Sequence, residues 1–218
     1  MKFNFFFFLL LIAISSQCYS QTNKSPYYSS VIIGSQQWMT KNLDVSNFRN
    51  GDEIPEAKNP SEWINYCSEG KPAWCYYNYD KKYNEKYGKL YNWYAVNDAR
   101  GLAPEGWRVS TYEDWKVLTD FVGSEEIASP KLKSVTGWEN SGNGSDEYGF
   151  NGLPGGSVGA YGMFGDIGNW GSWWCYNPNS NPVYGKYLKY DSDRVEDYAS
   201  YLKTDGLSVR CLMDIPEE

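Results

Sequence analysis

The segment from Tyr87 to Val122 constrains the fold more than any other part of the chain. It reads YGKLYNWYAVNDARGLAPEGWRVSTYEDWKVLTDFV. An aromatic run is followed by a turn around Pro104-Glu-Gly106 and then by a helix start, because Thr111 is a good N-cap and two acids follow it. Trp115 and Leu118 recur at helical spacing with Phe121 or Val122. The segment therefore predicts a buried turn or strand leading into an amphipathic helix.

Short strands and turns are predicted for most of the remaining chain. Residues 31–39 resemble a hairpin with its turn near Gly34, and residues 74–79 and 90–96 are aromatic strand or buried-turn candidates. A second short helix is expected between Glu125 and Lys133. The glycine-rich region 137–171 is predicted to be a long structured loop, residues 191–197 a polar turn, and residues 184–190 and 207–212 strands.

The first twenty residues are typical of a secretory leader. Lys2 precedes an apolar run from Phe5 to Ile14, and small and polar residues follow up to Ser20. The run of roughly ten apolar residues is shorter than the roughly 20 that span a bilayer. We expect cleavage after Ser20 and a secreted or cell-surface protein without a transmembrane segment. Cys18 offers lipidation as the alternative, but Gln17 stands where such sites usually carry a small residue.

Charge and composition exclude several classes of function. The net charge of −7 argues against a nucleic-acid partner, which would require clustered lysine and arginine. The chain has no histidine, which excludes a histidine general base and any histidine-ligated metal site. It has ten tryptophans and 20 tyrosines, rings that suit loop-rich cores and ligand-facing surfaces.

Four cysteines follow the leader: Cys67, Cys75, Cys175 and Cys211. An even number in an exported chain predicts two disulfides, although four cysteines allow three pairings. Cys67 and Cys75 are close in sequence around Gly70 and Pro72, so a local bridge between them is the simplest pairing. Cys175 would then pair with Cys211.

Six motifs in one order resemble the Fibrobacter succinogenes major paralogous domain. They are Gln37-Trp-Met39 with Asn42-Leu43, Tyr87 to Val96, Pro104 to Val109, Gly149 to Gly156, Trp173-Trp174, and Ser208-Val-Arg-Cys211. The resemblance covers residues 31–213, which leaves residues 1–20 as signal peptide, 21–30 as a flexible N-terminal segment and 214–218 as a tail.

The resemblance implies an α+β fold, distantly similar to formylglycine-generating (sulfatase-modifying) domains and to the C-type-lectin-like fold. Small twisted antiparallel sheets, two short helices and long structured loops are expected. It also implies an exported bacterial protein and no generally established activity. Trp38, Trp93, Trp107 and Trp115 lie in this framework and are expected in the core.

Two departures from the family pattern affect the cysteines. Family members commonly carry a cysteine where Ala103 stands, and Cys175 replaces the usual hydroxyl after the tryptophan pair. The resemblance thus suggests that Cys211 has exchanged a partner near position 103 for Cys175. The strand at Cys175 also resembles one that carries an active cysteine in formylglycine-generating enzymes, but Ser180 at the second position excludes a two-thiolate copper site.

Calcium is the one cofactor that the sequence suggests. The segment 139–147 clusters oxygen ligands with glycines, and Asn140, Asn143, Asp146 and Glu147 are the candidate ligands. The spacing matches no EF-hand, and a plain solvated loop is the competing interpretation. No cofactor is otherwise expected.

A non-enzymatic extracellular recognition module is the leading interpretation of function, with a glycan or a protein as partner. The glycine-rich loops carry rings that can stack on sugars or insert into a partner. The candidate ligand-binding residues are Tyr161, Trp170, Trp173, Trp174, Tyr176 and Asn177. A structural domain of the cell envelope is the alternative if these rings are buried. A polysaccharide-active enzyme with paired carboxylates is the third, although no spacing singles out such a pair.

Overall fold

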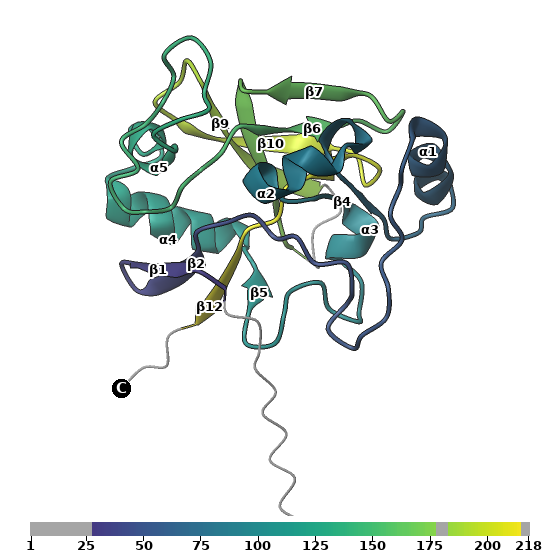
Figure 1. Ribbon diagram of the computed structural model, residues 1–218. Coiled ribbons are helices and arrows are strands. Elements are labelled where there is room, and N and C mark those ends of the chain that lie inside the picture. The colour runs from purple at the N-terminus through teal and green to yellow at the C-terminus, as the bar shows by residue number, and fades with distance from the viewer. Residues whose placement is uncertain (1–27, 178–182, 215–218) are drawn as a thin grey trace, which may run out of the picture.

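The computed structural model describes residues 28–177 and 183–214 (Figure 1). The predicted leader with Cys18, residues 21–27 and residues 215–218 of the predicted tail lie outside the described residues. Within the two described ranges, no helix is long and apolar enough to cross a membrane.

A four-stranded antiparallel sheet brings together the two ends of the described chain. β1 (Ser30–Ile33) and β2 (Gln36–Met39) form the predicted hairpin, and Gly34 takes the positive φ of 62° that the turn requires. β12 (Cys211–Asp214) pairs with the other edge of β2, and β5 (Arg108–Val109) completes the order β1-β2-β12-β5. The first and last strands therefore flank the same strand.

An eight-stranded sheet forms the larger layer, in the order β10-β9-β8-β6-β11-β4-β3 with β7 paired to β6. Its strands are β3 (Trp74–Cys75), β4 (Leu90–Asn92), β6 (Gly155–Val158), β7 (Phe164–Ile167), β8 (Trp170–Cys175), β9 (Val183–Lys189), β10 (Val195–Tyr201) and β11 (Gly206–Leu207). The pairing of β6 with β8 is parallel, and the others are antiparallel. With its short helices, this mostly β structure is an α+β domain.

The described chain contains five α-helices, so the prediction of two was wrong. The predicted pair is present as α4 (Tyr112–Val122) and α5 (Ser129–Leu132). The others are α1 (Pro60–Ser68), α2 (Asn84–Tyr87) and α3 (Trp93–Val96), together with the 3₁₀ turns η1 (Tyr77–Tyr79) and η2 (Lys81–Tyr83). Figure 1 places α1 on the opposite side of the molecule from α4 and α5.

The additional helices have physical causes that the sequence carries. Asn59 caps α1 by accepting a hydrogen bond from the Glu62 amide at 3.0 Å, and Pro60 occupies the first turn. The segment 90–96, predicted to be an aromatic strand or a buried turn, divides into β4 and α3 because the Asn92 side chain accepts from the Ala95 amide at 3.0 Å. An asparagine cap therefore ends the strand and begins the helix.

Part of the glycine-rich region belongs to the larger sheet, which corrects the prediction that residues 137–171 form a long structured loop. β6, β7 and the start of β8 lie within it. Gly156 has a φ of 65°, and a Cβ built there would lie 2.3 Å from the Gly165 carbonyl oxygen. Glycine is required because two backbone segments approach closely at this position.

The core consists of three clusters of buried side chains. One surrounds Trp38, Trp115 and Trp173, a second surrounds Trp93 and Trp174, and a third lies beneath α1 around Trp63. The four framework tryptophans predicted in the core, at positions 38, 93, 107 and 115, are all buried. Their rings meet largely edge to face, as for Trp38 and Trp115 at 5.6 Å between centroids.

All four cysteines among the described residues are buried free thiols, which corrects the two predicted disulfides. Cys175 packs in the cluster of Trp115 whereas Cys211 packs in the cluster of Trp93, so these two thiols belong to different parts of the core. Cys67 and Cys75 share the third cluster, but the Cys67 thiol donates to the Thr204 carbonyl at 3.4 Å. The proposed exchange of partners by Cys211 is therefore not present.

Candidate functional site

The structure separates the predicted ligand-binding residues. Trp173 and Trp174 are fully buried, and their indole N–H groups donate to Asn42 Oδ1 at 2.8 Å and to the Tyr91 carbonyl at 2.7 Å. These two rings build the core, which corrects their assignment to a ligand surface. Tyr161 is 80% exposed in the turn between β6 and β7, and Asn177 is half-buried beyond β8.

Trp170 and Tyr176 remain as candidates, and they line two different cavities. The first, here called the Trp170 cavity, has a volume of about 380 Å³. Side chains from β6, β7, β8 and β10 and from the turn after β10 surround it. They are Ser157, Asp166, Trp170, Ser172, Tyr198, Ser200, Tyr201, Leu202 and Asp205.

The register of three strands places the rings of the Trp170 cavity. Ser172 of β8 lies opposite Tyr187 of β9, which in turn lies opposite Glu196 of β10. Because alternate residues share a face, Trp170 stands two positions along from Ser172 on that face. Trp170 stacks on Tyr187 with centroids 4.7 Å apart and an interplanar angle of 12°.

Two tyrosines of β10 complete the aromatic wall. Tyr198 and Tyr201 meet edge to face at 4.6 Å, and Tyr198 is 43% exposed. A Cβ at Gly185 would lie 2.6 Å from the Tyr201 ring, so glycine at this position of β9 makes room for the ring. Burial raises the pKa of Tyr201 to about 12, which keeps its phenol neutral near pH 7.

Carboxylates and hydroxyls supply the polar groups of the Trp170 cavity. Asp166 is exposed in β7 and has a φ of 66°. Burial raises the pKa of Asp205, whose carboxylate accepts a hydrogen bond from the Leu202 amide at 2.8 Å. Among the described residues, no lysine or arginine lines this cavity directly. Lys189 Nζ lies 5.5 Å from the centroid of the Trp170 ring and pairs with Asp191 at 3.4 Å. The cavity therefore presents apolar ring surface beside hydrogen-bond acceptors, and the nearby Lys189 charge is already paired with Asp191.

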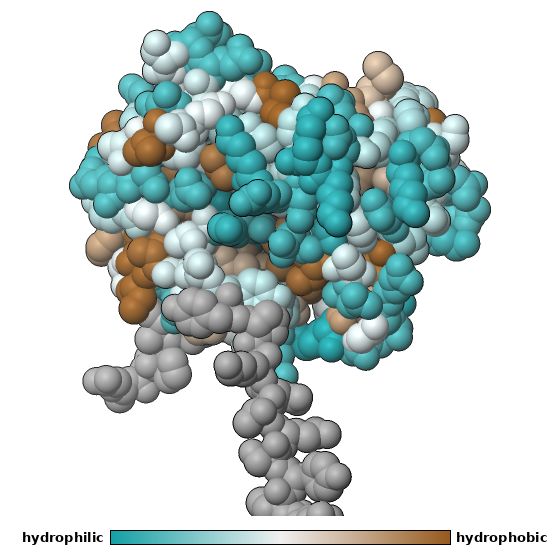
Figure 2. Space-filling model, in the orientation of Figure 1, coloured by the Kyte–Doolittle hydropathy of each residue, from teal (hydrophilic) through white to brown (hydrophobic). Residues whose placement is uncertain are grey.

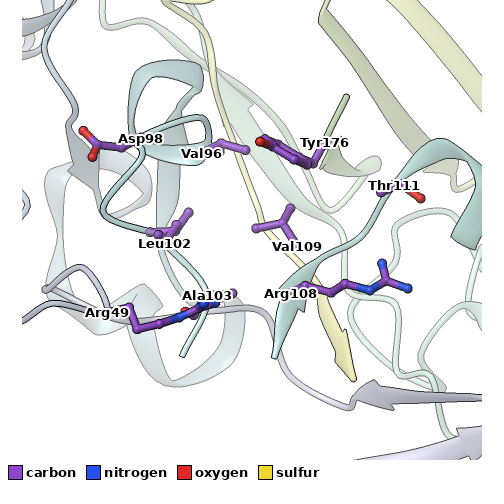
Figure 3. A pocket seen from close by; sticks show the side chains of 10 residues that line it. Arg49, Val96, Asp98, Leu102, Ala103, Arg108, Val109, Thr111 and Tyr176 are labelled. Atoms are coloured by element: carbon purple, nitrogen blue, oxygen red, sulfur yellow. The ribbon is translucent and has the colours of Figure 1, made fainter. Parts of the chain in front are cut away.

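The second cavity, here called the Tyr176 cavity, has a volume of about 450 Å³ and lies between α3, β5 and the loop after α3 (Figure 3). Val96, Leu102, Ala103, Val109 and the Tyr176 ring form an apolar lining. Polar side chains at its rim are Arg49, Asp98, Arg108 and Thr111. Figure 3 shows the Tyr176 hydroxyl directed toward Val96.

The Tyr176 ring is held in place from two sides. It stacks on Trp93 at 6.2 Å between centroids with an interplanar angle of 28°. Its amide donates to the Ser110 carbonyl at 2.8 Å, which ties the end of β8 to the residue before the α4 N-cap. The ring is thus a fixed wall of the cavity.

The candidate calcium ligands serve the local loop structure. Asn143 Oδ1 accepts from the Trp138 amide at 3.0 Å, and Asp146 Oδ1 accepts from the Asn151 amide at 2.6 Å. Burial raises the pKa of Asp146. Within residues 28–177 and 183–214, no three acidic or cysteine side chains come together in a group that could hold a metal ion.

Sequence reasoning missed the part of the Trp170 cavity that comes from β10 and its neighbours. The segment 191–197 was predicted to be a polar turn, but β10 begins within it at Val195. The available signal was the strand preference of Val195, Tyr198 and Tyr201, but their spacing of three hides the alternation of a strand, because the register shifts between Tyr198 and Tyr201. Asp166 and Asp205 carry no sequence signal that distinguishes them from other surface acids.

The family model described as the Fibrobacter succinogenes major domain matches residues 31–213. No curated protein and no solved structure matches the chain. The description of the matched family names no activity, substrate or partner.

Proposed function

We propose, from the premise that this chain belongs to the Fibrobacter succinogenes major domain family, that it is an exported, non-enzymatic module that binds glycans in the Trp170 cavity. One observation carries the proposal: Trp170, Tyr198 and Tyr201 line the same cavity as two aspartates and three serines. Rings can cover the apolar faces of a sugar while carboxylates and hydroxyls bond its hydroxyl groups.

The charge of the cavity narrows the class of glycan. Asp166 and Asp205 line it, no cationic side chain among the described residues does, and the nearby Lys189 is paired with Asp191. A uronic or sialic acid would bring like charges together in a partly buried site, which costs free energy. Neutral hexoses and N-acetylhexosamines are therefore the favoured ligands. A volume of about 380 Å³ suits one or two sugar units rather than a long chain.

Export and the wider fold relationship form part of the same proposal. The leader-like segment 1–20 supports secretion or display at the cell surface. Antiparallel strands, short helices and a buried tryptophan core support a distant relationship to C-type-lectin-like and sulfatase-modifying domains. Calcium stays a weaker part of the proposal, because two of its four candidate ligands already bond backbone amides.

A neutral-glycan array followed by calorimetry of each hit tests the proposal. We expect Trp170→Ala and Tyr198→Ala each to weaken binding roughly tenfold or more, since one stacked ring contributes about 1 to 3 kcal/mol. Tyr161→Ala is the matched control, because it removes an exposed ring that does not line the cavity. Equal losses in all three variants would contradict the assignment of the site.

A structural role in the cell envelope is the second candidate. The full burial of Trp173 and Trp174 favours it, because two of the five rings that were expected to face a ligand hold the core instead. A folded sample that binds no glycan on the array would support this role or a protein partner. Release of reducing ends from a bound glycan would instead support the polysaccharide-active enzyme.

A further inference from the structure

We propose that the Tyr176 cavity is a second binding site, independent of the Trp170 cavity, for a small organic carboxylic acid with an apolar body. The lining of the cavity calls for the apolar body. Val96, Leu102, Ala103 and Val109 surround it with the Tyr176 ring, and each of the four is at least 92% buried. Aliphatic or aromatic groups entering this space would transfer their own apolar surface from water into an apolar surrounding.

The charges at the rim call for an anionic group. Asp98 is neutralised by Arg100, whose guanidinium donates to both carboxylate oxygens at 2.8 Å. Arg108 is neutralised in the same way by Asp114, with Nη2 2.8 Å from Oδ1. Figure 3 shows the Arg108 guanidinium directed away from the apolar side chains. With Asp98 and Arg108 both paired, Arg49 is the remaining charged side chain that lines the cavity.

Arg49 has no carboxylate partner among the described residues. Its Nε donates to the Ala103 carbonyl and its Nη2 to the Trp107 carbonyl, both at 3.0 Å. The backbone amide of Arg49 also donates to the Gly101 carbonyl at 2.8 Å. The guanidinium is thus held at the rim by neutral acceptors, and its positive charge is not compensated there.

A guanidinium held in this way is suited to bind an anion. Nη1 makes no hydrogen bond with a described residue, so its two N–H groups are available to a ligand at the rim. Because the side chain is already ordered, little rotamer entropy is lost when an anion binds. A carboxylate attached to an apolar body would place its charge at Arg49 and its body against Leu102, Val109 and Tyr176.

Protein-observed amide NMR with 3-phenylpropionate as the probe tests this site, and 3-phenylpropionamide is the uncharged control. We expect the acid to shift the amide signals of Leu102, Ala103, Val109 and Tyr176 and to bind roughly tenfold more tightly than the amide. This ratio corresponds to one hydrogen bond between charged groups. Equal affinities for acid and amide, no binding of the acid, or shifts confined to other regions would overturn the proposal.

Two variants separate the charge of Arg49 from its shape. Arg49→Lys retains the cation and Arg49→Gln removes it, so the preference for the acid should decrease in the order wild type, Arg49→Lys, Arg49→Gln. Tyr198→Ala should leave acid binding unchanged, because Tyr198 lines the other cavity. If the variants at Arg49 do not fold, the affinities of the wild-type protein for the acid and the amide still show whether the site prefers a carboxylate. A protein that binds the acid but no glycan would contradict the proposed function and leave the second site standing.

Discussion

Arg210 is a fully buried charged residue whose guanidinium joins its own segment to two others, 39–42 and 150–151. It donates to the Met39 and Phe150 carbonyls and to Asn42 Oδ1, and it lies 4.5 Å from the centroid of the Phe150 ring. Burial lowers its pKa, yet an arginine retains its proton near neutral pH. The planar fork of donors explains why an arginine occupies this site in the core.

Arg210→Lys should destabilise the fold by about 3 kcal/mol, because an ammonium group cannot reach all three acceptors from one position. Urea unfolding followed by tryptophan fluorescence measures the change. Arg194→Lys is the control. The Arg194 side chain is 55% exposed and pairs loosely with Glu126 at 3.8 Å, so its substitution should change stability by less than about 0.5 kcal/mol. A similar effect of both substitutions would contradict the role given to Arg210.

Lys89 provides a prediction about pH. Its Nζ lies 3.7 Å from the centroid of the Trp74 ring, and burial lowers the pKa of the side chain to about 8. An unfolded lysine titrates near 10.5, so between about pH 8 and 10.5 the unfolded state binds more protons than the folded state. The contribution of Lys89 to stability therefore rises with pH in that window.

The free energy of unfolding of wild type and Lys89→Met, measured from pH 7.5 to 10, isolates this contribution. The wild-type value minus the variant value should increase with pH. Other groups that titrate in this range, such as Cys67, cancel in the difference. A difference that is constant with pH would show that Lys89 titrates normally in the folded protein.

At the scale of the element, α4 is fixed by its first turn. Thr111 and Asp114 form a capping box in which each side chain accepts a hydrogen bond from the backbone of the other. Asp114 also pairs with Arg108 of β5, so the helix start is attached to the small sheet. The buried face of α4, including Trp115 and Leu118, then packs into the core.

Asp114→Asn should cost about 2 kcal/mol of stability, since it removes the charge that Arg108 and the helix N-terminus both stabilise. Glu113→Gln is the matched control. Glu113 is in the same turn but exposed, so the same chemical change should have an effect of only a few tenths of a kcal/mol. Thermal or urea unfolding of the two variants checks the difference, which would vanish if only the helix dipole mattered.

Elements with a local signal could be predicted from the sequence, and elements specified by distant contacts could not. The β1–β2 hairpin and α4 were predicted because Gly34 and Thr111 act on their own neighbours. The strands in the glycine-rich region were missed because their pairing depends on close approach to other backbone segments. α1 was missed although Asn59 and Pro60 carried a local signal.

The same distinction applies to the candidate site. Trp170 could be selected from the sequence as a ring in a glycine-rich region. The sequence did not show, however, that Trp173 and Trp174 are buried in the core whereas Trp170 lines a cavity. Their burial depends on acceptors at Asn42 and Tyr91, far away in the chain. Likewise, Tyr198 lines the same cavity as Trp170 only because of the order of β8, β9 and β10.

At the scale of the whole molecule, the four cysteines are distributed over all three clusters of the core. Cys67 on the buried face of α1 and Cys75 of β3 share one cluster, Cys175 lies in the cluster of Trp115, and Cys211 lies in the cluster of Trp93. The larger sheet contributes side chains to every cluster, so we expect the clusters to open together. Each thiol then becomes accessible only when the whole domain unfolds.

Pulsed alkylation through a urea transition, with the label located by peptide mass mapping, tests this cooperativity. All four thiols should become labelled with one midpoint, and none should react in the native state, because burial also raises their pKa values. Earlier labelling of Cys67 and Cys75 would show that the region beneath α1 opens separately. Protection that persists in full denaturant would show that the thiols are oxidised.

The small sheet has a mechanical consequence. β1 and β12 both run antiparallel to β2, and Ser30 lies opposite Met39 whereas Asp214 lies opposite Gln36. Tension applied through the two ends of the domain would therefore pull β1 and β12 in opposite directions along the axis of β2. Under such shear, the hydrogen bonds of both ladders carry the load together instead of breaking one at a time. A domain tethered at both ends would resist extension far better than one peeled open at a strand edge.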